Sequence, residues 1–212
     1  MSLVAQSPNT DTDTDTDTDT DTSHTTGTEA DMSAAETHAE RMLAALGLDL
    51  SDPGLLATPG RMVRALREMT TPATFTPTDF EVTAEPGQLV LVRDIRFVSV
   101  CEHHVLPFVG VAHVGYVPRF RILGLSKVAR VVQHYARRPQ VQERLTRQIA
   151  DWMSGQLDAA GVGVLISAEH TCMTLRGVGA AGSTTKTSAL RGVLLDNAAA
   201  RAEFMSLATG AS

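Results

Sequence analysis

Residues 95–117 read IRFVSVCEHHVLPFVGVAHVGYV, and this stretch contains two runs that are typical of β-strands. The runs cover residues 95–100 and 109–117, and Pro118 closes the second. β-Branched and aromatic side chains favour strands, whereas proline cannot donate a hydrogen bond within a sheet. A further run of the same kind, residues 89–92, comes just before them. We therefore predict antiparallel strands at the centre of the fold.

Two helices are predicted before these strands, within residues 34–70, because apolar residues recur there at helical spacing. Gly47 ends the first helix, and Thr58-Pro59 opens the second. The apolar faces consist of Met42, Leu43, Leu46 and Leu48, and of Met62, Val63, Leu66 and Met69. The other side of the second helix carries Arg61, Arg64 and Arg67. Residues 70–87 are rich in Thr and Pro and predict an irregular connection.

Helices and strands also follow the central strands. Residues 122–125 predict a short strand or turn, and Ser126 is a good N-cap for a helix over residues 127–136. Pro139 fits the first turn of the next helix, whose buried face would hold Val141, Leu145, Ile149, Trp152, Met153 and Leu157. The remaining predictions are strands over residues 164–175 and 184–194 and a helix near residues 199–207. This mixture of elements predicts an α+β fold with a core over residues 88–207.

The N-terminal 33 residues have the composition of a disordered tail, and residues 34–212 form the predicted domain. Residues 11–22 are six Asp-Thr dipeptides, a tract without apolar side chains to bury. Eight of the 24 acidic residues lie in residues 1–31, where there is no Lys or Arg, so the rest of the chain has a charge near +2. No basic stretch is long enough to follow a nucleic-acid backbone, and we expect no nucleic-acid partner.

The sequence shows no membrane segment and no export signal. No apolar run approaches the roughly 18 residues that a membrane-spanning helix needs. The first thirty residues also lack the basic and apolar regions of a signal peptide. We therefore expect a cytoplasmic protein.

Both cysteines of the chain lie beside histidines. Cys101 and His104 are three residues apart, and His170 and Cys172 are two apart on a predicted strand, where they would share a face. Two buried thiols or one disulfide would be the ordinary explanation, but the neighbouring imidazoles favour a metal site. Thiolate and imidazole ligands favour zinc over hard cations. Four protein ligands would make a structural site, whereas two cysteines and one histidine with a water would make a catalytic one.

Two histidines beside this site favour catalysis. If Cys101, His104 and Cys172 bind the metal, His103 and His170 remain as bases close to it. A zinc-bound water has a pKa of about 7, so these imidazoles can exchange protons with it or with the substrate at neutral pH. Other histidines lack such neighbours, and we interpret them as tail, helix-surface and core-flank residues: His24, His38, His113 and His134.

Further residues indicate an anionic, base-bearing ligand. Ser126, Lys127 and Arg130 gather at a predicted helix N-terminus, which favours an anion, and Arg176 shares the predicted strand face with Cys172. Together these residues predict a polyphosphate site, although each cation alone is ordinarily a solvated surface charge. Glu143, in the first helical turn with Gln142 beside it, can accept two N–H donors from a guanine edge, or can merely complement the helix dipole.

The order and spacing of these motifs resemble the GTP cyclohydrolase I family over residues 35–207. The motifs are SVCEHH at residues 99–104 with PFVG at 107–110, GLSKVAR at 124–130, RPQVQERLT at 138–146 and HTCMTLRG at 170–177. The resemblance implies that Cys101, His104 and Cys172 bind zinc and that His103 and His170 act as acid and base. It places Ser126 near the ribose and Gln142 and Glu143 at the guanine. It assigns triphosphate contacts to Lys127, Arg130 and Arg176, with Arg61 and Arg64 reaching in from a neighbouring subunit.

The resemblance also implies a fold, an assembly and a reaction. The family has the tunnelling fold, in which subunit sheets join into a pentameric barrel, two rings stack as a homodecamer, and the sites lie at subunit junctions. GTP would be hydrolysed at C8 with zinc and His170, and formate would leave. His103 and Ser126 would then assist the ribose rearrangement to 7,8-dihydroneopterin triphosphate. This reaction is the first step of pterin and tetrahydrofolate biosynthesis.

Two other classes of protein are compatible with part of this pattern. A non-catalytic zinc and nucleotide-binding module would have four protein ligands and no turnover. A zinc nucleobase deaminase would need an H-x-E motif together with a PCxxC motif, and the sequence does not contain this pair.

Overall fold

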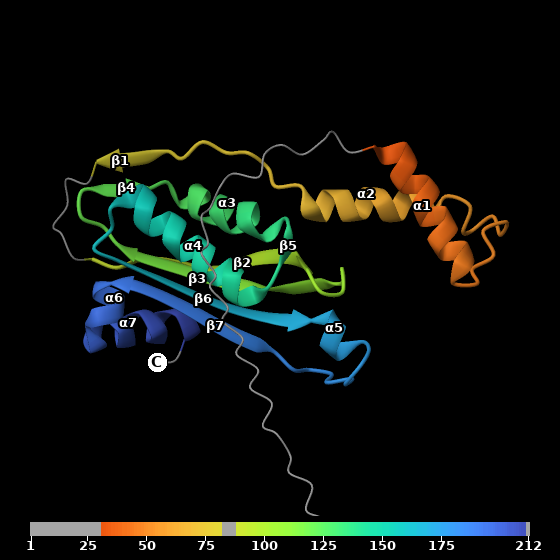
Figure 1. Ribbon diagram of the computed structural model, residues 1–212. Coiled ribbons are helices and arrows are strands. Elements are labelled where there is room, and N and C mark those ends of the chain that lie inside the picture. The colour runs from red at the N-terminus through yellow and green to blue at the C-terminus, as the bar shows by residue number, and fades with distance from the viewer. Residues whose placement is uncertain (1–30, 82–87, 211–212) are drawn as a thin grey trace, which may run out of the picture.

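A computed structural model describes residues 31–81 and 88–210 (Figure 1). The predicted tail therefore lies outside the described residues except for residues 31–33, where a helix already begins at Met32. The elements are, in chain order, α1 Met32–Ala45, α2 Thr58–Thr70, β1 Asp79–Glu81, β2 Val90–Cys101, β3 Pro107–Val117, β4 Arg121–Leu123, α3 Leu125–Ala136, β5 Pro139–Gln140, α4 Gln142–Leu157, β6 Gly161–His170, α5 Thr171–Thr174, β7 Thr185–Gly192, α6 Val193–Asp196 and α7 Ala198–Thr209. The predicted α+β class is confirmed.

A five-stranded sheet in the order β5-β2-β3-β6-β7 forms the centre of the molecule. Its long strands β2, β3, β6 and β7 pair antiparallel, and the two-residue β5 pairs parallel with the end of β2. The strands β1 and β4 form a separate antiparallel pair, so part of the predicted irregular connection is a strand. The antiparallel sheet expected from the sequence is present, whereas the barrel of subunit sheets stays a prediction.

Strand β2 joins two runs that the sequence divides. Its register against β3 shifts between Val92 and Ile95, and Asp94 in this bulge has a φ of 57°. The Asp94 N–H donates to Nδ1 of His113, 3.4 Å away on β3. A bulge adds an unpaired residue and bends the strand, which explains why the apolar pattern breaks here although the strand continues.

Helices cover both faces of the sheet. Figure 1 shows α3 and α4 on one side and α6 and α7 on the other. The two faces alternate along β6, because Val164 and Ile166 belong to the core under α3 and α4, whereas Leu165 belongs to the second core with Phe204 of α7. A Cβ atom on Gly163 would lie 2.8 Å from the Phe204 ring. The glycine therefore lets α7 approach the sheet closely.

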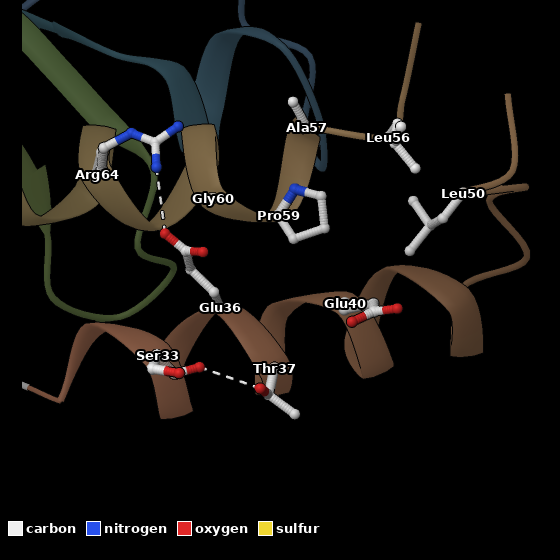
Figure 2. A pocket seen from close by; sticks show the side chains of 10 residues that line it. All are labelled: Ser33, Glu36, Thr37, Glu40, Leu50, Leu56, Ala57, Pro59, Gly60 and Arg64. Atoms are coloured by element: carbon white, nitrogen blue, oxygen red, sulfur yellow. Dashed lines mark hydrogen bonds and ion pairs between the residues drawn. The ribbon is translucent and has the colours of Figure 1, made fainter. Parts of the chain in front are cut away.

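Helices α1 and α2 form a hairpin beside the sheet, and both were predicted. The Asp31 side chain caps α1 by accepting a hydrogen bond from the Ala34 N–H at 2.9 Å. A hollow of about 410 Å³ lies between the two helices, and Arg64 of α2 pairs there with Glu36 of α1 at 3.2 Å. Figure 2 shows this ion pair and the side chains that line the hollow. Across the described residues, no helix is both long and apolar enough to cross a bilayer.

Three local predictions were wrong. Gly124, not Ser126, is the N-cap of α3, so Ser126 already lies inside the helix. Pro139 lies in β5, and α4 begins after it at Gln142. Strand β6 ends at His170 and is followed by the helical turn α5. The proposed face of His170, Cys172, Thr174 and Arg176 on one strand therefore does not exist.

Candidate metal centre and active site

The register of the sheet explains why the two cysteine–histidine pairs meet. Phe108 at the start of β3 lies opposite Ser99 of β2 on one side and opposite His170 of β6 on the other. Both β2 and β6 run antiparallel to β3, so they end at the same edge of the sheet. Cys101 ends β2, and α5 directly after β6 carries Cys172. Two segments about seventy residues apart are brought together in this way.

A tight turn holds the first pair. The Cys101 N–H donates to the Leu106 carbonyl at 2.8 Å, and the Val105 N–H donates to the Cys101 carbonyl at 2.9 Å. Val105 adopts a φ of 55°, which closes the turn. His103 and His104 are exposed on it, and their Nδ1 atoms lie 3.8 and 3.6 Å from the Cys101 sulfur.

Within the described part of the chain, one group of three residues has ligand atoms that all lie within 4.8 Å of one another: Cys101, His103 and His104. Cys172 adjoins this group, because its thiol and that of Cys101 share a side-chain hydrogen bond. Burial raises the pKa of the Cys172 thiol, and Cys101 raises it further by charge and by this hydrogen bond. Arg176 acts in the opposite direction. Soft sulfur and imidazole donors in this arrangement suit a transition-metal ion, and bound metal would stabilise both thiolates.

His170 is half-buried and held on two sides. Its ring stacks on Phe108, with the centroids 4.5 Å apart and the planes at 7°. Its Nε2 lies 2.8 Å from Oε1 of Gln142. Burial lowers the pKa of His170, and Glu143 partly opposes this shift. The imidazole is therefore biased toward its neutral form, which a proton acceptor requires.

Gln142 and Glu143 lie in the first turn of α4, as the sequence predicts. This turn lies at the same edge of the sheet as the candidate ligands, because Gln140 just before it pairs with Cys101. The Glu143 side chain is exposed, whereas Gln142 is only 1% exposed and lies under the site. N–H groups in the first helical turn have no carbonyl partner within the helix. An exposed carboxylate beside such donors can bind a ligand edge that offers N–H groups and a carbonyl.

The predicted phosphate residues of α3 lie elsewhere in this chain. Tyr116, near the far end of β3, accepts a hydrogen bond from the Leu123 N–H at 3.0 Å, and α3 begins two residues later. Tyr116 and Phe108 are eight positions apart on β3, which corresponds to roughly 26 Å. Figure 1 shows the start of α3 beside β4 and, at the opposite end, α5. The chain does not bring Ser126, Lys127 and Arg130 together with Cys101, His170 and Cys172.

The remaining predicted cations are exposed. Arg176 follows α5 and lies close enough to Cys172 to lower the pKa of its thiol. Arg61 and Arg64 are exposed on α2, and Arg64 is paired with Glu36. Within the described chain, α2 packs on α1 and β2 and places neither arginine in the Cys101 group.

A network of polar side chains, to which the sequence pattern assigns no role, supports the turn that carries His103 and His104. Arg144 of α4 pairs with Glu102, and its Nε donates to Gln140 Oε1 at 2.9 Å. The Glu102 N–H donates to the Gln140 carbonyl at 3.1 Å, and the Glu102 carboxylate lies 3.8 Å from Nε2 of His103. Glu102 and Arg144 lie inside the quoted motifs, but nothing in their spacing indicates that they meet. This network ties the histidine-bearing turn to α4.

The fold and this site define an α+β protein with a candidate cysteine–histidine metal centre at one edge of its sheet. A model of the GTP cyclohydrolase I family matches residues 35–209. A GTP cyclohydrolase 1 of Mycobacterium tuberculosis is 50% identical over 184 residues, which cover 84% of this chain and 90% of that protein. One from Corynebacterium glutamicum is 47% identical over 193 residues, with 89% and 98% coverage. The chain belongs to the GTP cyclohydrolase I family and is an enzyme of this kind.

Among solved structures, an archaeosine synthase QueF-Like chain in its apo form matches with a TM-score of 0.43. The identity is 19%, and the match covers 51% of this chain and 97% of that one. A similarity this low carries no argument about the fold or the reaction.

Proposed function

We propose that this enzyme hydrolyses and rearranges GTP to 7,8-dihydroneopterin triphosphate with release of formate, as the first step of a pterin and tetrahydrofolate pathway in the cytoplasm. The single observation that carries the proposal is the contact between Cys101, which is grouped with His103 and His104, and Cys172, which lies in the helical turn directly after His170. The family match supports GTP as the substrate.

Zinc is the proposed metal, bound by Cys101, His104 and Cys172. Two sulfurs and one imidazole nitrogen are donors that zinc prefers, and three protein ligands leave a position for water. When bound, zinc would supply a water of lowered pKa for hydrolysis at C8 of the purine. The buried position of both thiols also limits their exposure to solvent in the absence of substrate.

His170 is the proposed proton acceptor and donor for opening of the imidazole ring of the purine. Its burial favours the neutral ring, and it lies beside both Cys172 and Glu143. His103, on the exposed turn next to His104, is proposed to transfer protons in the later ribose steps together with Ser126.

The guanine is proposed to bind at the start of α4. The Glu143 carboxylate would accept hydrogen bonds from N1–H and the 2-amino group, and first-turn N–H groups of α4 would donate to O6. The sequence assigned Gln142 to the same base, and in the structure its side chain lies directly behind this position.

The triphosphate is proposed to bind between subunits. Lys127, Arg130 and Ser126 lie at the end of the sheet opposite the candidate metal centre, so one chain cannot present both groups to one GTP molecule. A second subunit that placed its α3 N-terminus against the first subunit's Arg176 would complete the site. Arg61 and Arg64 would come from a further neighbour, and pentameric rings stacked as a homodecamer with barrel-forming sheets provide such junctions.

The assay is direct: purified protein loaded with zinc is mixed with GTP, and formate and oxidised, fluorescent pterin are quantified. We expect one formate for each pterin. Ammonia release without formate would contradict the proposal and indicate a deaminase.

A non-catalytic zinc and nucleotide-binding module is the second candidate. The position of His103 favours this candidate, because its Nδ1 lies 3.8 Å from the Cys101 sulfur. After small side-chain movements, both atoms could bind the same zinc ion. In that case four protein ligands would close the site, zinc and GTP would bind, and no formate would appear.

A further inference from the structure

Gln142 contacts His170 from the interior of the protein. Its Oε1 lies 2.8 Å from the His170 Nε2, and the glutamine side chain is 99% buried. Because a neutral imidazole carries its proton on either nitrogen, this contact alone does not say which atom donates. The surroundings of the Gln142 amide decide the direction.

The amide nitrogen of Gln142 faces acceptors. It lies 3.3 Å from the Ile166 carbonyl, 3.0 Å from the Thr185 carbonyl and 3.0 Å from the Thr187 hydroxyl. Backbone carbonyls can only accept hydrogen bonds. Rotating the amide by 180° would place its oxygen against two carbonyl oxygens in a buried site, which is strongly unfavourable. The amide NH₂ must therefore face β6 and β7, and Oε1 must face His170.

Two threonines complete the network and support the same orientation of the Gln142 amide. The Thr146 hydroxyl donates to the Gln142 carbonyl at 2.7 Å, as a helical threonine does to the residue four positions before it. The Thr146 hydroxyl has then used its hydrogen, so its oxygen accepts a hydrogen bond from the Thr187 hydroxyl, 2.6 Å away. Thr187 has then used its only hydrogen, so it accepts from the Gln142 amide. Each hydrogen in this buried chain has one consistent place.

We propose that Gln142 is a positioning residue that holds His170 with its proton on Nε2, so that Nδ1 is the unprotonated nitrogen that exchanges protons with the substrate. The proposal rests on the proposed role of His170 as acid and base. Gln142 fixes the edge of the ring, and the Phe108 stack fixes its plane.

This role differs from the guanine contact that the sequence suggested for Gln142. The two amide hydrogens face Ile166, Thr185 and Thr187, and Oε1 faces His170. The side chain therefore has no polar atom directed to a ligand. Recognition of the base falls to Glu143 and to the N–H groups of the first turn of α4.

The tautomer can be measured independently of catalysis. In magic-angle-spinning ¹⁵N NMR of zinc-loaded protein labelled at histidine, protonated and unprotonated ring nitrogens give separate signals, and those of His170 are assigned by their loss in His170→Ala. We expect Nε2 to be protonated and Nδ1 unprotonated. A proton on Nδ1 in the wild-type protein would overturn the proposal, whether or not any variant folds.

A variant pair tests the assignment to Gln142. Gln142→Leu should lose the single tautomer and show both forms, with kcat lower by about 100-fold and KM for GTP little changed, because general-base positioning is lost. Gln133→Leu on α3, which removes a 2.6 Å hydrogen bond to the Arg96 carbonyl, is the matched control and should keep the tautomer and kcat. An unchanged tautomer in Gln142→Leu would overturn the proposal. If the wild type releases no formate, the proposed function fails while the tautomer result stands on its own.

Discussion

Phe108 and His170 stack face to face across neighbouring strands, with centroids 4.5 Å apart and planes at 7°. Phe108 is fully buried, so the histidine lies on a rigid aromatic surface at the point where β6 ends. The pair links the core of the sheet to the edge at which the candidate ligands gather. Packing of the core and alignment of the proposed base are therefore coupled.

Phe108→Leu should lower kcat more than its stability cost explains. The ring would lose its stacking partner, worth about 0.5–1.5 kcal/mol beyond buried area, and His170 would reorient. Phe97→Leu is the control, because Phe97 is also buried and its ring lies edge-on to Phe108 at 5.9 Å without stacking on His170. Steady-state kinetics and thermal unfolding of both variants check this. Equal kcat values in the two variants would reject the coupling.

Complementation tests the proposal that two subunits share each site. His170→Ala and Lys127→Ala should each be inactive alone, but subunits co-expressed with different tags and purified together should regain formate release. Some junctions then combine an intact metal end with an intact α3 end. Co-assembly of His170→Ala with Cys172→Ala should regain nothing, because both changes lie at the same end. Absence of recovery in the first pair would contradict a site shared between subunits.

Glu143→Ala should weaken binding of GTP without weakening binding of inorganic triphosphate. The lost carboxylate would have accepted two hydrogen bonds from guanine, and hydrogen bonds involving a charged group contribute about 1.5–3 kcal/mol each. A rise of at least roughly tenfold in the GTP dissociation constant is expected from one such bond. Calorimetric titration with both ligands measures this difference. Equal weakening of both would remove the carboxylate from the guanine site.

Much of this arrangement can be predicted from the pattern of residues. Apolar periodicity marked the long strands and the helices, and the cysteine–histidine spacings indicated one metal centre made from two segments. The helical turn at Cys172 could not be predicted, because it depends on a tertiary contact in which the Thr171 hydroxyl donates to the Pro107 carbonyl. The burial of Gln142 was equally hidden, since its partners come from β6 and β7, far along the chain. Side-chain spacing also says nothing about the separation of α3 from the metal end.

Acid should destabilise the fold through His113 of β3, which contacts the bulge of β2. Burial lowers the pKa of His113 below its usual 6.5, Asp94 partly opposes the shift, and Arg93 adds to it. The unfolded chain therefore binds this proton more tightly than the folded chain does. The contribution of neutral His113 to the free energy of unfolding is complete above about pH 6.5 and is lost as the pH falls through the lower folded-state pKa. Protonation would also remove the acceptor for the Asp94 N–H.

His113→Gln should therefore show a smaller loss of unfolding free energy between neutral and mildly acidic pH than the wild-type protein. Denaturant titrations at a series of pH values compare the two slopes. Parallel profiles would show that His113 does not contribute to acid sensitivity.

The central claim is that two thiolates and one imidazole bind zinc and leave a position open, with His103 outside the ligand set. His103 is the decisive residue because its ring lies with Cys101 and His104 in one potential ligand group. The most direct test is the zinc content per chain of His103→Ala, measured after dialysis beside wild-type protein and Cys172→Ala. We expect that His103→Ala retains one zinc per chain and that Cys172→Ala loses it. Loss of zinc from His103→Ala would reveal a closed, four-ligand site and contradict the account.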